Sequence, residues 1–431
     1  MREMKDSGIE WVGAIPQDWQ LSKIGSLYTQ RNEKVSDKNY QPLSVTMQGI
    51  LPQLATAAKT DDGDNRKLVR VGDFAINSRS DRRGSCGISP LDGSVSLINI
   101  ILTPRTAMHP GYYNWLFHTT LFADEFYKWG HGIVADLWTT RWQEMKSITV
   151  PVPEYAEQER IAAFLDAGCA EIDTVLEKTR ASIEEYKKLK QAVITQVVTK
   201  GIRGDRPMKN SGIEWIGDIP AEWKVASIGR FCFVTKLAGF EFTNDMMSNI
   251  QDSGDIPIVR AQNIKMGKFI NNISEFIPYR ISQKLERCAL NRKCLIITFI
   301  GAGIGEVAIF NEPKRYHLAP NVAKIVINVG MEHFVTEEYL LYFLMSFAGQ
   351  EEINKIKKAT AQPSLSMGTI RSIKMVLPDS IEEQSEIVSY LDMRCASIDA
   401  LIAKKQQYLI EIENYKKSLI YEYVTGKKEV V

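Results

Sequence analysis

The sequence predicts an α+β protein with two pseudo-symmetric domains separated by a pair of long antiparallel coiled-coil helices. Three observations predict it: the chain repeats itself, each half ends in a long helical pattern, and the intervening segments mix helices with short strands. The repeat is the clearest of them. Residues 4–13 return almost unchanged as residues 208–217, and the similarity continues through Ile15-Pro16 and Trp19. A repeat of this size governs how the rest of the chain is interpreted.

A second echo follows later in each half. Residues 157–173 share Glu-Gln, Leu-Asp, Cys-Ala and Ile-Asp pairs with residues 383–399. The first echo has an offset of 204 residues and the second an offset of 226, so the segment between the echoes is 22 residues longer in the second half. The repeats therefore bracket two segments that do not resemble each other, which predicts two different surfaces on one symmetric frame.

Each second echo begins a long helical pattern. Apolar residues recur at steps of three and four from residue 161 to residue 197, and again from residue 387 to residue 423. Neither stretch contains proline, and Gly201 and Gly426 follow as expected C-caps. The pattern therefore predicts two long helices, each with one apolar stripe. The stripes include Leu189 and Tyr415.

The length of these helices predicts that they pair. About 44 residues at 1.5 Å per residue give a rod of roughly 65 Å, and one such rod cannot bury its stripe alone. Each rod can lie separately on its own domain. However, the length and the missing helix breakers favour packing of the two rods on each other as a coiled coil.

Proline and glycine mark the boundaries of these elements. Pro151 and Pro153 precede the first rod and Pro378 precedes the second, because proline restricts the preceding residue to an extended conformation. The segment from residue 201 to residue 207 predicts a linker between the halves. The expected organisation is a first domain at 1–150, a central long helix and linker at 151–203, a second domain at 204–375 and a distal long helix at 376–431.

The segments between the echoes predict mixed secondary structure. Strands are expected at 67–71, 94–100, 294–299 and 322–327, where apolar residues alternate or run together between turns. Short helical regions are also expected, in stretches rich in Leu, Phe and Tyr. They cover residues 111–129 and 336–358.

Composition bounds the class of protein. A chain of 431 residues with 44% apolar and 24% charged residues suits two to four packed domains. No apolar run approaches the roughly 20 residues that a bilayer span needs. The N-terminus lacks the apolar stretch of a secretory signal. A cytoplasmic protein without a membrane partner is therefore expected.

The net charge of +1 is unevenly distributed along the chain. Residues 23–145 and 225–371 together carry six more basic than acidic side chains, and the rest of the chain carries five more acidic than basic ones. Such a bias fits DNA-facing segments on a neutral frame, because phosphate neutralisation drives nucleic-acid affinity. Chance explains so small a bias equally well.

Neither a metal nor a cofactor is predicted. The six cysteines form no CxxC pair, and the five histidines form no HExxH motif. Residues 299–305, FIGAGIG, match the FxGxG loop of many adenine methyltransferases. That chemistry needs a following helix and an [ND]PPY loop, whereas an apolar stretch follows and the chain has no Pro-Pro. A hairpin with a glycine turn is the simpler interpretation, and an adenine methyltransferase is kept as an alternative.

Polar, basic loops are the better candidates for function. Arginine can recognise the edge of guanine, and asparagine and glutamine can recognise the edge of adenine. Arginine and lysine also neutralise phosphate groups. Residues 77–85, 260–265 and 357–362 combine these types. For any one such cluster a solvated surface loop is the commoner case. The candidate DNA-binding residues are Asn77, Ser78, Arg79, Arg82, Arg83, Lys128, His131, Arg260, Gln262, Asn263, Lys265, Lys358 and Gln362.

Together these features resemble the specificity (S) subunit of type I restriction–modification systems. Each half opens with SGIEWxGxIPxxW, and each long helix begins after a proline with Glu-Gln followed by Leu-Asp. The ending at residues 415–427 and the run ATAQPSLS at residues 359–366 agree with the family. In the first half, residues 130–136 replace the usual glutamine-containing loop. The resemblance spans essentially the whole chain.

The resemblance implies a non-catalytic DNA-binding subunit. It implies two target-recognition domains, each reading one half of a split site on double-stranded DNA, with the helix pair as spacer. It also implies that two methyltransferase subunits dock on the helices and that two motor-nuclease subunits complete the restriction complex. A coiled-coil scaffold without DNA readout is the other alternative, and it would show no salt-dependent affinity for DNA.

Overall fold

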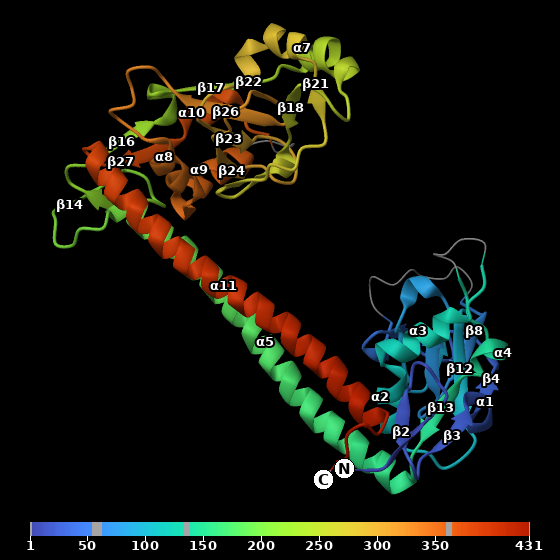
Figure 1. Cartoon of the computed structure of the whole chain (residues 1–431). Coiled ribbons are helices and arrows are strands. Elements are labelled where there is room, and N and C mark those ends of the chain that lie inside the picture. The colour runs from blue at the N-terminus through green and yellow to red at the C-terminus, as the bar shows by residue number, and fades with distance from the viewer. Residues whose placement is uncertain (1, 54–62, 133–137, 359–363, 431) are drawn as a thin grey trace. The chain divides into compact units, whose positions relative to one another are not determined.

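The computed structural model describes residues 2–53, 63–132, 138–358 and 364–430. The chain forms two compact units (Figure 1). Unit 1 comprises Met1–Arg180 and Gln406–Val431, and unit 2 comprises Ala181–Lys405. Each unit contains a mixed α+β domain and one end of each long helix. The predicted fold class is confirmed.

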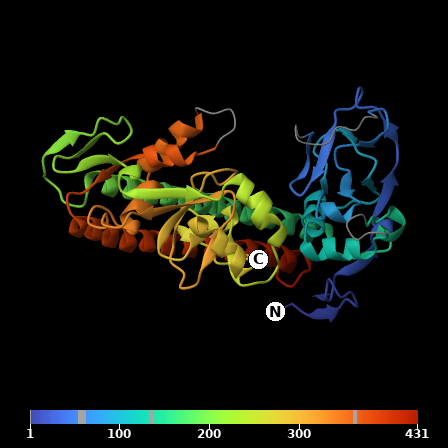
Figure 2. The same cartoon turned by 90° about the horizontal axis from the view of Figure 1, so that it is seen from above.

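The two long helices are α5 (Tyr155–Lys200) and α11 (Ile381–Val424), and they lie side by side (Figures 1 and 2). In unit 1, Lys416 Nζ donates to Asp173 Oδ1 at 2.6 Å. In unit 2, Lys190 Nζ donates to Asp399 Oδ2 at the same distance. A residue early in one helix thus meets a residue late in the other, which confirms the antiparallel pairing. Exposed pairs of this kind contribute about 0–1 kcal/mol each, so the apolar seam supplies most of the stability.

The seam follows the predicted stripes with two exceptions. Leu189 is 46% exposed and Tyr415 is 57% exposed, so the assignment of these two residues to the stripe was wrong. An α-helix has 3.6 residues per turn, so a stripe counted in steps of three and four drifts around the helix. Gly201 and Gly426 have φ values of 74° and 71° just after the helices, as predicted for C-caps. The buried seam residues are Ile161, Leu165, Cys169, Leu176, Ile183, Val197, Ile387, Leu391, Cys395, Ile398 and Leu419.

The sequence repeats build the same joint in both units. In unit 1, Trp19 Nε1 donates to Glu157 Oε2 at 2.9 Å, and Arg2 pairs with the same carboxylate. Equivalent residues do the same in unit 2. There Trp223 Nε1 donates to Glu383 Oε2 at 3.0 Å, and Arg206 Nη1 pairs with Glu383 Oε1 at 2.7 Å. The repeated tryptophan and Glu-Gln motifs therefore tie the opening segment of each repeat to the start of a long helix.

The glutamine of each Glu-Gln pair fastens a neighbouring loop. Gln158 Oε1 accepts from the backbone N–H of His109 at 2.8 Å, and Gln384 Oε1 accepts from that of Thr336 at 3.1 Å. Both amides are buried, so these bonds satisfy polar groups that water cannot reach. The loops in question lead into the helices that cover each domain.

Each unit has a four-stranded antiparallel sheet with the same order. In unit 1 the order is β10-β9-β12-β4, and in unit 2 it is β24-β23-β26-β17. The central strands β9 and β23 are fully buried, as their apolar sequences predict. The bounds are β4 Tyr28–Arg31, β9 Phe74–Asn77, β10 Cys86–Ile88, β12 Asn99–Pro104, β17 Cys232–Lys236, β23 Cys294–Thr298, β24 Val307–Phe310 and β26 Val322–Ile327.

The remaining strands complete smaller sheets. In unit 1 the sheet β11-β8-β5 is antiparallel, whereas in unit 2 β18 runs parallel to β25. Unit 1 also contains β1 Met4–Asp6, β2 Ala14–Pro16, β3 Gln20–Lys23, β5 Lys34–Val35, β6 Leu43–Thr46, β7 Gly49–Pro52, β8 Arg66–Val69, β11 Gly93–Val95 and β13 Thr149–Val152. Unit 2 also contains β14 Met208–Asn210, β15 Asp218–Pro220, β16 Lys224–Ser227, β18 Ile256–Val259, β19 Ile264–Lys265, β20 Lys268–Phe269, β21 Phe276–Ile277, β22 Ala289–Leu290, β25 Tyr316–Leu318 and β27 Lys374–Leu377.

Two local expectations were too coarse. Each predicted short helical region is a pair of helices, because a Thr or Ser caps the second helix of each pair: Thr119 accepts from Phe122 N, and Ser346 Oγ accepts from Gly349 N. The expected strand at 94–100 is divided between β11 and β12. The pairs are α2 (Pro110–Phe117) with α3 (Thr120–Lys128), and α8 (Glu337–Met345) with α9 (Phe347–Lys358).

Short helices complete both units. They are α1 (Ile24–Leu27) and α4 (Trp142–Met145) in unit 1, and α6 (Gly239–Glu241), α7 (Tyr279–Lys284) and α10 (Met367–Ser372) in unit 2. Within the described residues, no helix combines the length and the apolar character that a membrane crossing requires.

Candidate nucleic-acid interface

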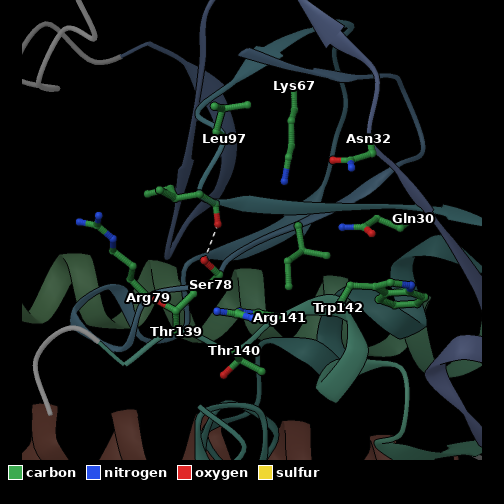
Figure 3. A pocket seen from close by; sticks show the side chains of 12 residues that line it. Gln30, Asn32, Lys67, Ser78, Arg79, Leu97, Thr139, Thr140, Arg141 and Trp142 are labelled. Carbon is green, nitrogen blue, oxygen red and sulfur yellow. Dashed lines mark hydrogen bonds between the residues drawn. The ribbon is translucent and has the colours of Figure 1, made fainter. Parts of the chain in front are cut away.

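An open hollow of about 390 Å³ lies in unit 1, where the chain leaves the main sheet (Figure 3). Its walls come from the ends of β4 and β9, from β8 and from the start of α4. Three basic residues, two amides and one tryptophan are among the lining side chains. They are Lys67, Arg79, Arg141, Gln30, Asn32 and Trp142.

Backbone hydrogen bonds hold the hairpin that follows β9 in place. The N–H of Ser78 donates to Ile98 O at 3.3 Å, and the N–H of Thr140 donates to Ser78 O at 3.0 Å. The N–H of Ser80 donates to Trp138 O at 2.9 Å. Because these bonds involve only the main chain, they fix the rim of the hollow whatever the side chains are.

The three basic residues differ in how they are held. Lys67 is partly buried, its Nζ donates to Asn99 O at 2.7 Å, and burial lowers its pKa. Arg79 and Arg141 are exposed, and neither guanidinium has an ionic partner among the described residues. Two guanidinium groups without a carboxylate keep their full charge for an anionic ligand.

The other lining residues suit base recognition. Gln30 and Asn32 present amides from the end of β4, and Trp142 lies at the first position of α4 (Figure 3). Within the described part of the chain, no acidic residue lines the hollow. Cations that neutralise phosphate, combined with amides and arginines that match base edges, form a surface able to bind duplex DNA.

Among the predicted residues of unit 1, the hollow includes Ser78 and Arg79. The hydroxyl of Ser78 already donates to Ile98 O. Asn77 is buried, and its Oδ1 accepts from the N–H of Arg79 at 3.0 Å, so its amide serves the turn. Arg79 is therefore the residue of this group whose side chain is turned to solvent at the hollow.

The other predicted residues of unit 1 lie around the rim. Arg83 forms an ion pair with Asp124 and lies 6.0 Å from the ring of Tyr127. Arg82 is exposed with only a distant contact to its neighbour Asp81, at 3.8 Å. Two further predicted residues lie nearby: Lys128 contacts Glu10 and Glu125, and His131 is exposed and bridges to Thr139 through its backbone.

Several of the predicted residues of unit 2 are held by local bonds. Arg260 is paired with Glu275, and the buried Asn263 donates to two backbone oxygens. Lys265 lies 3.6 Å from Glu306, which is in the hairpin between β23 and β24. Gln262 is exposed, Lys358 is the last residue of α9, and Gln362 lies outside the described residues.

The glycine-rich segment at residues 299–305 is a hairpin turn, as the simpler interpretation predicts. β23 and β24 pair in antiparallel register on either side of it, and Gly301 and Gly305 have φ values of 98° and 94°. A strand follows where a cofactor loop needs a helix N-terminus to face the anion. The geometry required for an adenine methyltransferase is thus not present at this segment.

Sequence reasoning missed Gln30, Asn32, Lys67, Arg141 and Trp142. They lie in short segments that were assigned to strands or left without a role, so the search for polar, basic loops passed over them. Their one common signal is position, because most of them flank a strand or helix end. Only the folded chain brings these distant positions to one hollow.

Comparisons with known proteins find related sequences. A family model described as the type I restriction modification DNA specificity domain matches residues 220–414. The MjaVIII specificity subunit of Methanocaldococcus jannaschii is 24% identical, over 96% of this chain and 94% of that protein. The EcoKI specificity subunit of Escherichia coli K12 is 21% identical, over 96% of this chain and 90% of that protein.

Solved structures share the fold. One, from work on complex assembly and conformational transition of the type I R-M system, has a TM-score of 0.73 at 14% identity, covering 96% of this chain and 99% of that one. The HsdS subunit of Thermoanaerobacter tengcongensis has a TM-score of 0.51 at 15% identity, covering 96% and 98%. In sequence and in fold, the chain is therefore similar to the specificity subunits of type I restriction–modification systems.

Proposed function

We propose that this chain reads a bipartite DNA target and recruits two methyltransferase subunits and two motor-nuclease subunits to it. Unit 1 reads one half of the target through the hollow at the end of β9. The observation that carries the proposal is the hollow itself, where cations and amides converge without a described acidic neighbour. A scaffold without DNA readout has no use for such a convergence.

Within the hollow, we assign different tasks to different side chains. Arg79 and Arg141 are exposed and unpaired among the described residues, so they bind phosphate or a guanine edge. Gln30 and Asn32 read adenine, because their amides match the donor and acceptor of its major-groove edge. The partly buried Lys67 contributes positive electrostatic potential rather than a direct contact with DNA, since its ammonium group already donates to a carbonyl oxygen.

The partner subunits dock on the helix pair in this proposal. Several large apolar side chains on α5 and α11 are exposed although the seam is filled. A contiguous apolar patch on a helix surface is typical of a protein–protein contact, so the proposal requires that these side chains gather on the docking face. They are Tyr155, Val175, Tyr408, Ile410 and Tyr415 in unit 1 and Leu189, Met393 and Leu401 in unit 2.

The first experiment measures binding to random duplex DNA across a range of salt concentrations. The variant Arg79→Ala with Arg141→Ala should weaken binding and lower the salt slope by about 1.8, because each lost phosphate contact removes about 0.9. The control is Lys38→Ala with Arg70→Ala, which removes the same number of charges from exposed positions of unit 1 that do not line the hollow. If the wild-type chain shows no salt-dependent affinity, the scaffold alternative holds and the proposal is wrong.

A second experiment tests whether the helix pair sets the gap between the half-sites. Removing residues 180–186 and 403–409 together shortens both helices by seven residues. The residues on either side keep their antiparallel partners, as judged from Asp173 with Lys416 and Lys190 with Asp399. The spacer in the selected DNA target should shorten while both half-sequences stay the same. A change in the half-sequences themselves would contradict the spacer role.

A further inference from the structure

The hairpin after β9 in unit 1 has a structural equivalent after β23 in unit 2. In unit 1, the N–H of Ser78 donates to Ile98 O at 3.3 Å, and in unit 2 the N–H of Phe299 donates to Asn321 O at 3.2 Å. The N–H of Thr140 donates to Ser78 O at 3.0 Å, and that of Leu365 donates to Phe299 O at 2.9 Å. The equivalence was hidden because the two hairpins have no sequence similarity.

The register of the main sheets extends this equivalence. Asn77 at the end of β9 pairs with Asn99, and Thr298 at the end of β23 pairs with Val322. Isolated bridges follow directly in both units, between Arg79 and Thr139 and between Ile300 and Ser364. Counting along the paired strands from these points, Lys236 takes the place of Asn32. The same backbone frame therefore carries Lys236, Ile300 and Ser364 where unit 1 carries Asn32, Arg79 and Thr139.

The start of the next helix gives one more pair of equivalent positions. Arg141 immediately precedes α4, and Ser366 immediately precedes α10, where its Oγ accepts from Thr369 N at 3.0 Å. A cation of unit 1 is thus replaced by a neutral cap. We call the set Lys236, Ile300, Ser364 and Ser366 the unit 2 corner.

We propose that the unit 2 corner reads the second half of the DNA target, and that it does so mainly through apolar contact with a thymine methyl group. The inference rests on the proposed function, since it assumes that the equivalent hollow of unit 1 reads the first half. It goes further by naming the residues and the base feature that unit 2 recognises.

The chemistry of the unit 2 corner supports this assignment. Ile300 is a large apolar side chain that is 39% exposed at the rim, and the Cβ position of the next residue, Gly301, faces open space. A branched apolar side chain in that place matches the methyl group that distinguishes thymine in the major groove. Lys236 Nζ lies 4.5 Å from the ring centroid of Phe299, so its cation is held close to the rim for a phosphate contact.

One acidic residue, Glu306, lies in the hairpin beside the unit 2 corner. Glu306 lies at the other end of the hairpin and contacts Lys265 at 3.6 Å. Paired in this way, the carboxylate repels a phosphate less than a free one would. The unit 2 corner contains one cation, Lys236, whereas the hollow of unit 1 contains three. The affinity of the corner for DNA therefore depends more on shape and apolar contact.

The test selects binding sites for the full chain from a pool of randomised duplex DNA. The wild-type chain should enrich two sequence blocks, one of which contains thymine. Ile300→Ser should relax the thymine-containing block and leave the other unchanged, and Arg79→Ala should do the reverse. Lys314→Gln is a matched control for Lys236→Gln, because Lys314 is exposed in the loop between β24 and β25.

Replacing that thymine by uracil in the selected duplex isolates the methyl contact. The wild-type chain should lose about fourfold in affinity, which corresponds to one buried methyl group, and Ile300→Ser should lose nothing further. If Arg79→Ala alters one block while Ile300→Ser and Lys236→Gln alter neither, the unit 2 corner is not the second reader. If the wild-type chain enriches no block at all, the proposed function itself fails.

Discussion

The hairpin sites of the two units share a backbone but not their side chains, whereas the joints at the helix starts share both. At the hairpins, the same main-chain bonds hold Ser78-Arg79 in unit 1 and Phe299-Ile300 in unit 2. At the joints, Trp19 and Glu157 repeat as Trp223 and Glu383. The difference shows where side chains are free to vary.

The physical reason is the kind of bond that builds each region. A hairpin fixed by N–H and C=O groups accepts nearly any side chain, so its surface can change while its shape persists. A joint fixed by an indole N–H on a carboxylate loses its bond when either residue changes. The joints therefore have the same residues in both units, whereas the surfaces proposed to read DNA have different ones.

The largest effect is expected from a substitution that breaks the joint of unit 2. Glu383→Ala leaves the buried Trp223 Nε1 without its acceptor and leaves Arg206 with only Glu222, so it should cost about 3 kcal/mol of unfolding free energy. Glu157→Ala should cost less, because Arg2 and Glu157 are more exposed than Arg206 and Glu383, although each arginine keeps a second carboxylate, Asp18 or Glu222. Urea denaturation followed by tryptophan fluorescence measures both, with the exposed Glu382→Ala as control. Equal losses would mean that the two joints do not differ in burial.

The second prediction compares the charges of the two proposed reading sites. Arg79→Ala with Arg141→Ala should lower the salt slope of DNA binding by about 1.8, and Lys236→Gln by about 0.9. The affinity at low salt should fall in the same order. Fluorescence anisotropy of a labelled duplex at several salt concentrations provides the slopes. A larger change for Lys236→Gln would reverse the assigned balance between the units.

The third prediction concerns acid stability. Burial lowers the pKa of His317 in unit 2 and of His118 in unit 1. The unfolded chain therefore binds a proton first, so stability is lost as pH falls below about 6.5, by at most about 1.4 kcal/mol per pH unit for each histidine.

The loss should be larger for His317, which is completely buried, whereas His118 is partly exposed. Replacing each histidine in turn by glutamine should remove its share of the slope between pH 7 and pH 5.5 in urea denaturation. The same slope in both variants and in the wild-type chain would show that carboxylates, not these histidines, set the acid limit.

The smallest effect is expected from a substitution that adds a positive charge to the unit 2 corner. Ile300→Arg places an arginine where unit 1 has Arg79, on the same backbone bridge. The salt slope should rise by about 0.9, and selection for the thymine-containing block should weaken. Salt-dependent binding and site selection with this variant check both. An unchanged slope would show that position 300 does not approach the DNA backbone.

Local patterns in the sequence were enough to predict the frame. The long helices follow from periodicity and missing prolines, their ends from Gly201 and Gly426, and the hairpin at residues 299–305 from an apolar stretch on each side of the glycines. Each of these depends on interactions between residues that are close in the chain. The division of residues 94–100 between two strands was not predictable, because it depends on partner strands far along the chain.

The candidate site was predicted far less completely. A search for basic clusters found Arg79 but also Arg83, whose charge is taken up by Asp124 on α3. It missed Lys67 and Arg141, which lie apart in sequence and share the hollow with Arg79. A cation is free or paired depending on the residues that lie next to it in the folded chain. A single sequence does not show which residues these are.

By itself, then, the sequence determined the duplication, the pair of long helices and the resemblance to specificity subunits, because these follow from periodicity and from repeated side-chain motifs. Tertiary structure alone decided that two unrelated hairpins occupy the same place in the two units, and which polar side chains meet there. Main-chain hydrogen bonds impose no requirement on side-chain identity, so a site built on them leaves no repeated pattern in the sequence.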